Sequence, residues 1–263
     1  MIKIKKLYEI ECETFDVVIK ELNKAIEKVC DKKENEEFNI ILEDMIESVS
    51  ATEQLIKDYK INAGMTTLRN SFELIVTYIA VIKNEKHRIN YWDIKKKRNI
   101  KAFSEEISKE ISIDIYEETY HFLCEFAHPT ILRNYFCDVS KFENGLEINR
   151  CIGMFFMIMI VYDYITYLNI FELQDEDLEM NTLLLLMFSA FSYFLGKYKI
   201  NTDIIKKYEV IFGTEEEKEM LEDKRTELKD FIIENNAEIV KKLTESMNKN
   251  RELKLKIIEY VKN

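Results

Sequence analysis

The sequence contains few of the residues that make turns. Among its 263 residues there are five glycines, one proline and one tryptophan. Sandwiches, barrels and doubly wound sheets need frequent turns built from glycine and proline, so this composition disfavours them. Leucine, isoleucine, lysine and glutamate are abundant instead, as in helices joined by short polar loops. We therefore expect an all-α fold.

Histidine and paired cysteine are also scarce. There are three histidines, and the cysteines are scattered and odd in number, with no Cys-x-x-Cys pair (Cys12, Cys30, Cys124, Cys137 and Cys151). Neither a zinc knuckle nor a thioredoxin-type site is therefore indicated. We expect reduced thiols in a cytoplasmic protein, and the N-terminus lacks the apolar core of a signal peptide.

Motifs for phosphate binding and nucleophilic catalysis are absent. The sequence has no Gly-rich phosphate loop, nucleophile elbow, Ser-x-x-Lys or zincin motif, which argues against kinases, dehydrogenases and hydrolases on α/β folds. No cofactor and no metal are predicted. The net charge of −11 disfavours broad nucleic-acid binding, although the run Lys95 to Arg98 leaves a local basic patch open.

Two long apolar runs, residues 151–171 and 182–196, are predicted to be the central helices of a bundle. The first is long enough to span a bilayer, but Asp163 interrupts it, and polar side chains interrupt the second. A helix that is apolar on all sides also suits the centre of a large bundle, so we expect core helices, with a membrane hairpin as the alternative.

Apolar spacing along the chain predicts a multi-helix bundle over residues 1–200 and a C-terminal amphipathic helical arm over residues 201–263. We expect the arm to bind a partner protein. Gly64 is predicted to restart a helix, and a turn is predicted at Asn144-Gly145. The expected helices before the two apolar runs cover residues 5–32, 35–60, 65–83, 102–111 and 114–127.

Residues 117–130, EETYHFLCEFAHPT, contain Glu-x-x-His twice. On a helix, Glu118, His121, Glu125 and His128 fall on one side, opposite an apolar side. That side is either an ordinary solvated face or a row of catalytic or ligand groups. Di-iron bundles take Glu-x-x-His from two helices, whereas here both copies lie on one helix. His128, in the last turn, is a candidate general acid or base.

Charged residues also lie in apolar surroundings. Arg69 and Glu73 stand four residues apart on a largely apolar helix, and Asp163 is the only charge between residues 151 and 171. A lone buried carboxylate is costly unless it is paired or protonated. We expect Arg69 to pair with Glu73 or Asp163, near His128. Such a cluster is either a buried ion pair that fixes helix register or the floor of an active site.

The segments TLRNSFELIVTYIAVIKN and YHFLCEFAHPT resemble the HEPN-like helical superfamily, over roughly residues 40–170. The resemblance implies a prokaryotic toxin or antiviral-defence protein with ribonuclease activity. In catalytic members an arginine lies shortly before the histidine, and the pair acts across a dimer. His128 matches the histidine, but the arginine position is not matched, since the residues there are His121, Phe122 and Leu123. Either Arg69 or Arg133 takes that role in space, or the chain is a catalytically silent relative.

Three functions follow as hypotheses. The first is a homodimeric, metal-independent ribonuclease of defence or toxin type that binds RNA. Its catalytic residues would be His128, Arg69 and Glu73, with support from His121, Glu125, Asp163, Tyr120 and Arg133. The second is a non-catalytic helical module that binds another protein through the C-terminal arm, and the third is a metal-binding helical bundle.

Overall fold

The computed structural model describes residues 2–30, 33–91, 115–128, 131–141, 143–172, 178–197 and 250–262. Within these residues all regular structure is helical, with nine α-helices, one 3₁₀ helix and no strand, which confirms the all-α prediction. The chain divides into two compact units, Met1–Gln174 and Asp175–Asn263, a division earlier than the boundary predicted after residue 200. The predicted helix at 102–111, the basic run at 95–98 and residues 201–249 of the predicted arm lie outside the described residues.

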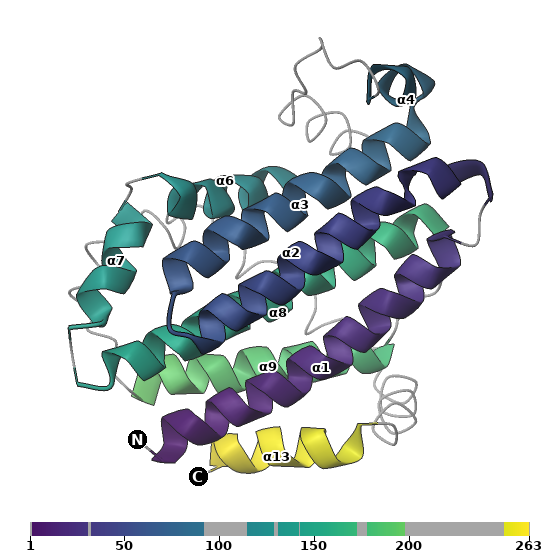
Figure 1. Ribbon diagram of the computed structural model, residues 1–263. Helices are drawn as coiled ribbons and strands as arrows, with labels where there is room; N and C mark the ends of the chain where they lie inside the picture. Colours follow the sequence, from purple (N-terminus) through teal and green to yellow (C-terminus); the bar gives the residue numbers. More distant parts are fainter. Residues whose placement is uncertain are drawn as a thin grey trace, which may run out of the picture. The chain divides into compact units, whose positions relative to one another are not determined.

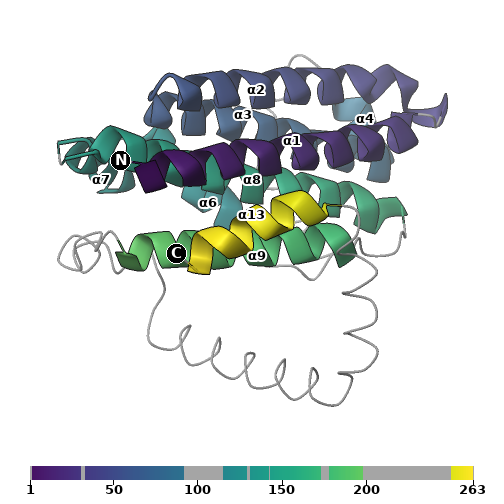
Figure 2. The ribbon, with the colours of Figure 1, turned by 90° about the horizontal axis from the view of Figure 1, so that it is seen from below.

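The first unit is a bundle of long helices (Figure 1). Its elements are α1 (Ile2–Cys30), η1 (Lys33–Phe38), α2 (Asn39–Lys57), α3 (Ile61–Lys83), α4 (Glu85–Tyr91), α6 (Ile115–Ala127), α7 (Ile131–Val139) and α8 (Gly145–Glu172). Helix α2 packs along α3, α1 packs along α8, and α6 lies against α3. Figure 2 shows the first two of these pairs from below. Helix α8 also contacts α2 and α3, so it forms the centre of this unit.

Helix α1 shows why the bundle forms. Its buried positions follow the spacing of three and four residues that places side chains on one helix face. The stripe consists of Ile4, Leu7, Glu11, Thr14, Val18, Leu22, Ala25 and Val29. The carboxyl group of Glu11 therefore occupies a core position on this face, in a mostly apolar stripe.

The turn between α2 and α3 comes before the predicted restart at Gly64. The chain reverses at Asp58, Tyr59 and Lys60, and the Lys60 N–H donates to the Leu55 carbonyl over 2.8 Å. Tyr59 adopts a left-handed backbone conformation with φ of 62°. Gly64 lies inside α3, where its N–H donates to the Lys60 carbonyl.

The predicted turn at Asn144-Gly145 is confirmed. Asn144 has φ of 60°, and α8 begins at Gly145. A Cβ atom on Gly145 would lie 1.8 Å from the Val139 carbonyl oxygen, so only glycine allows the chain to pass this closely. Helix α7, which comes before the turn, was not predicted.

Helix α8 contains the first apolar run. Of the described helices it is the one whose segment, Gly145–Leu168, is long and apolar enough to cross a membrane. In the structure 72% of its most apolar stretch is buried by other parts of the chain. This burial fits the core-helix expectation, because a core helix is covered by protein on most sides.

The second unit contains α9 (Leu178–Lys197) and α13 (Arg251–Lys262), which pack against each other. Helix α13 buries Leu253, Ile257 and Tyr260 at helical spacing. The rings of Tyr193 and Tyr260 meet edge to face with centroids 6.2 Å apart. The end of the predicted arm is therefore an amphipathic helix, as expected.

Candidate functional site

Helix α3 presents an ion pair at the edge of the bundle. Arg69 and Glu73 stand one helical turn apart, so their side chains project from the same face. The Arg69 Nη2 atom lies 2.7 Å from the Glu73 Oε1 atom, and the two side chains are 25% and 28% exposed. We expected Arg69 to pair with Glu73 or Asp163, and in the structure its ion pair is with Glu73. The pair is only partly buried, so water reaches both charges.

Tyr120 joins this pair from the facing helix α6. The Arg69 Nη2 atom donates to the Tyr120 hydroxyl over 3.4 Å, and the guanidinium carbon lies 5.5 Å from the centre of the Tyr120 ring. Burial raises the pKa of Tyr120, the Cys124 thiol raises it further, and Arg69 opposes both effects. The Tyr120 hydroxyl therefore stays protonated near neutral pH and can donate a hydrogen bond. We call Arg69, Glu73 and Tyr120 the arginine cluster.

Burial of the Arg69 guanidinium opposes its charge, but the nearby Glu73 carboxylate and the Cys124 and Tyr120 side chains outweigh this, so the pKa of Arg69 is raised. Among the described residues its Nε atom is buried without a hydrogen-bond acceptor. The guanidinium therefore stays protonated within its ion pair, and its Nε–H is an unused donor.

The two histidines of α6 differ in their relation to the arginine cluster. His121 is exposed, and its ring lies 6.1 Å from that of its neighbour Tyr120. His128 follows the last residue of α6, and its backbone N–H donates to the Cys124 carbonyl over 3.2 Å. Within the described part of the chain the exposed His128 imidazole makes no hydrogen bond or ion pair. The His121 ring thus lies near Tyr120 of the arginine cluster, whereas within the described residues no contact joins the His128 imidazole to that cluster.

The antiparallel packing of α3 and α6 explains this difference. The Thr66 hydroxyl donates to the Phe126 carbonyl over 3.3 Å, so the His128 end of α6 faces the beginning of α3. Arg69 lies further along α3 and directs its side chain to Tyr120. Seven residues of helix span about 10.5 Å, so the backbones of His121 and His128 lie about that far apart along the direction of α6.

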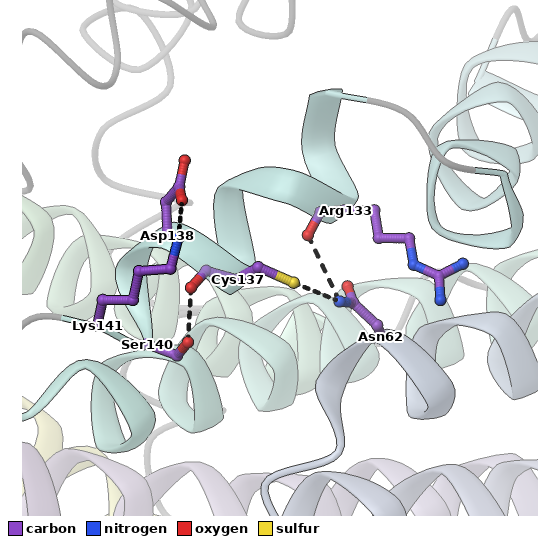
Figure 3. Close-up of polar contacts among 6 residues, drawn as sticks. All are labelled: Asn62, Arg133, Cys137, Asp138, Ser140 and Lys141. Atoms are coloured by element: carbon purple, nitrogen blue, oxygen red, sulfur yellow. Dashed lines mark hydrogen bonds and ion pairs between the residues drawn. The ribbon is translucent and has the colours of Figure 1, made fainter.

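Arg133 lies on α7, near the start of α3. Its carbonyl accepts a hydrogen bond from the Asn62 Nδ2 atom over 3.4 Å, and the same nitrogen lies 3.7 Å from the Cys137 Sγ atom. In Figure 3 the Arg133 side chain extends past Asn62, away from Cys137. Its side chain is exposed, so within the described residues Arg133 is a free surface cation rather than a member of the arginine cluster.

Asp163 lies on α8 and is not paired with Arg69. Within the described residues its half-buried carboxylate has no ion-pair or hydrogen-bond partner. Burial raises the pKa of Asp163 from 3.8 to about 7. Its charge in turn contributes to the raised pKa of Tyr164 and Tyr167, after the larger effect of their own burial. Protonation of Asp163, rather than an ion pair with Arg69, therefore offsets the cost of burying this carboxyl group.

Glu125 is half-buried on α6, and the Glu118 side chain lies outside the described part of the chain. Across the described residues no three His, Cys, Asp or Glu side chains come together as a set of metal ligands.

Two buried polar groups were missed in the sequence. The Tyr164 hydroxyl of α8 lies 2.9 Å from the Ser71 hydroxyl of α3, and both side chains are fully buried. Glu11 of α1 is fully buried against α8, in the neighbourhood of Arg150. A signal for Glu11 was present, because it occupies a core position in the apolar stripe of α1.

Comparison with protein-family models, with curated proteins and with solved structures gives no significant match.

Proposed function

We propose that the chain is a metal-independent ribonuclease of toxin or defence type, in which Arg69 binds a phosphate of RNA. The observation that carries the proposal is the arginine cluster with His121 beside it. The Arg69 guanidinium is held in place by a carboxylate and a tyrosine and stays a quarter exposed, and the His121 imidazole lies near the ring of that tyrosine. Guanidinium groups bind phosphate oxygens in a two-pronged geometry, which suits this position.

The chemistry needs one proton acceptor and one proton donor. In RNA cleavage the 2′-hydroxyl attacks phosphorus, a base takes its proton, and an acid gives a proton to the departing 5′-oxygen. The products are a 2′,3′-cyclic phosphate and a 5′-hydroxyl. Histidine suits either role because its charge changes readily near neutral pH. Within one chain we infer that His121 acts at a phosphate bound to Arg69, with the Tyr120 hydroxyl as a further donor.

His128, which the HEPN-like resemblance favours, would act differently. It follows the last residue of α6, eight residues beyond Tyr120, and on this arrangement its cation would come from a second copy of the chain. The proposal thus has two arrangements, one around His121 within a chain and one around His128 across a homodimer. Each makes a separate prediction for the two histidines.

The experiment measures cleavage of a mixed-sequence RNA in EDTA by the wild type and by His121→Ala, His128→Ala and Arg69→Ala. General acid or base catalysis contributes about 10²–10⁴ in rate, so loss of the active histidine would be clear. Both histidines are exposed, and their variants should melt like the wild type. His87→Ala, on α4, is the matched control.

A loss confined to His121→Ala supports the arrangement within one chain, and a loss confined to His128→Ala supports the dimer arrangement. Wild-type rates in both histidine variants, or no cleavage by the wild type, would reject the nuclease. Toxicity on expression gives a second readout for the same four variants.

A second function, binding of another protein, is favoured by a specific observation. Glu73 already neutralises Arg69, and the chain carries a net charge of −11, so the surface as a whole repels nucleic acid. On this alternative a basic partner protein binds the acidic surface. Its test is co-purification with a partner that is lost at high salt but unaffected by His121→Ala and His128→Ala.

A further inference from the structure

Glu11 is a carboxyl group fully buried between α1 and α8. Its exposed fraction is 0%, and among the described residues neither carboxylate oxygen has a hydrogen-bond partner within normal geometry. Burial raises the pKa of Glu11 well above its usual value, and the Cys151 thiol and the Arg150 guanidinium offset only part of this. Since a buried unpaired anion is costly, the folded chain favours the neutral acid.

Arg150 lies on α8 in the neighbourhood of Glu11 and contacts the side chains of Glu147, Tyr8 and Tyr59. The Glu147 carboxylate, one turn earlier on α8, forms an ion pair with the Arg150 Nη2 atom. The guanidinium carbon lies 3.9 Å from the centre of the Tyr8 ring and 4.5 Å from that of the Tyr59 ring. Within the described residues the buried Arg150 Nε atom has no acceptor. The Nη2 group of Arg150 is therefore bound to Glu147, and its Nε–H is an unused donor.

The contacts of Arg150 with Glu147 and Tyr59 stabilise the turn between α2 and α3. The Tyr59 hydroxyl donates to the Glu147 Oε1 atom over 2.6 Å, and the Tyr59 ring covers the guanidinium. Tyr59 also carries the left-handed backbone of the turn, a conformation that a tyrosine adopts only when its surroundings hold it there. The turn thus depends on the group formed by Tyr59, Glu147 and Arg150, which we call the latch.

We propose that protonation of Glu11 controls the latch. While Glu11 is neutral, Arg150 stays paired with Glu147 and in contact with the Tyr59 ring, and the α2–α3 turn is closed. When Glu11 loses its proton, it becomes a buried anion, and Arg150 is the cation that acts on it. Drawing the guanidinium inward gives Glu11 a partner but removes one from Glu147 and uncovers the Tyr59 ring, so the turn opens.

The other titratable groups around Glu11 do not supply a competing cation. On its own helix they are Tyr8 and Cys12, and on α8 they are Glu147 and Cys151. On α2, the charge of Lys57 lowers the pKa of the neighbouring Cys12. The Lys57 Nζ atom forms an ion pair with the Glu53 Oε1 atom over 2.5 Å, so its charge is already paired. Arg150 is therefore the group on which ionisation of Glu11 would act.

Hydrogen exchange of the turn amides, followed from pH 5.5 to 8.5, tests the proposal. The amides of Asp58, Tyr59 and Lys60 donate to carbonyls at the end of α2, so opening of the turn exposes them. After correction for the intrinsic pH dependence of exchange, their protection in the wild type should fall by up to about tenfold per pH unit, because the ionised fraction of an acid below its pKa rises tenfold per unit. The amides of His87 and Arg88, which bond to Asn84 at another turn, serve as the internal control.

Two variants sharpen the result. Glu11→Gln keeps the shape of the neutral acid and cannot ionise, so protection of the turn should become independent of pH. Glu147→Gln removes the ionic partner of Arg150, so the turn should be poorly protected at every pH. Equal pH dependence in the turn and in the control amides of the wild type would overturn the latch, since it would mean that the bundle opens as a whole. Equal pH dependence in the wild type and in Glu11→Gln would assign the effect to another group.

Discussion

Replacement of Asp163 by asparagine should make the protein more stable, by an amount that grows with pH. The carboxylate has no ionic partner among the described residues, and burial raises its pKa from 3.8 to about 7. Below pH 3.8 the acid is protonated in both the folded and the unfolded chain, so it contributes no difference. Between pH 3.8 and about pH 7 the Asp163 carboxyl is ionised in the unfolded chain only, so the free energy of unfolding of the wild type falls as pH rises.

The size of the effect follows from linkage. One pH unit changes the free energy of unfolding by about 1.4 kcal/mol for each linked proton, so the interval from 3.8 to about 7 corresponds to about 4 kcal/mol. Asp163 is not fully buried, and water that reaches it will reduce this figure. At pH 5 the expected difference is about 1–2 kcal/mol, and above pH 7 it reaches its plateau.

The assay is urea unfolding of the wild type and of Asp163→Asn at half-unit steps from pH 5 to 8. The difference in the free energy of unfolding should increase up to about pH 7 in favour of the variant. If the two curves run parallel, burial does not disfavour the Asp163 carboxylate, and the reasoning fails. If Asp163→Asn is instead less stable at pH 8, the carboxylate has a cationic partner, contrary to the structure.

Four other outcomes are expected. Arg69→Ala should lower the free energy of unfolding by about 1 kcal/mol in urea titrations, because its ion pair is partly exposed. Tyr164→Phe should cost about 1 kcal/mol, and a double-mutant cycle with Ser71→Ala should show coupling between the two hydroxyls. Gly145→Ala should lower stability by about 2–3 kcal/mol, because backbone must move to admit the methyl group. The purified chain should remain in the supernatant without detergent, and recovery only in the membrane pellet would mean that α8 is not a core helix.

Helix positions were predictable where the apolar spacing is long and regular. The ends of α1, α2, α3 and α6 lie within about four residues of the predicted ones, as expected from the uncertainty of helix boundaries. Helix α7 was missed because it has nine residues between two turn signals, the proline at 129 and the turn at Asn144-Gly145. A short helix of this kind is stabilised by packing rather than by its own sequence.

The candidate site was predictable only where its residues are neighbours on one helix. The pairing of Arg69 with Glu73 follows from their spacing of four residues, and the structure contains it. Contact with Tyr120 depends on how α3 and α6 pack, which the sequence does not specify. The expected closeness of Arg69 to His128 depended on the same packing and stays a prediction, and the ring contact of His121 is with its neighbour Tyr120.

The ion pair on α3 has a consequence for any ligand of Arg69. Because Glu73 is attached to the same rigid helix, it acts as a tethered competitor that is always present at high effective concentration. An anion in solution must displace this carboxylate, so a weakly bound monovalent ion such as chloride would be excluded. A group that offers two oxygens in one plane matches the guanidinium better than a single-point contact does. The arginine thereby selects for the geometry of its ligand, at the expense of affinity.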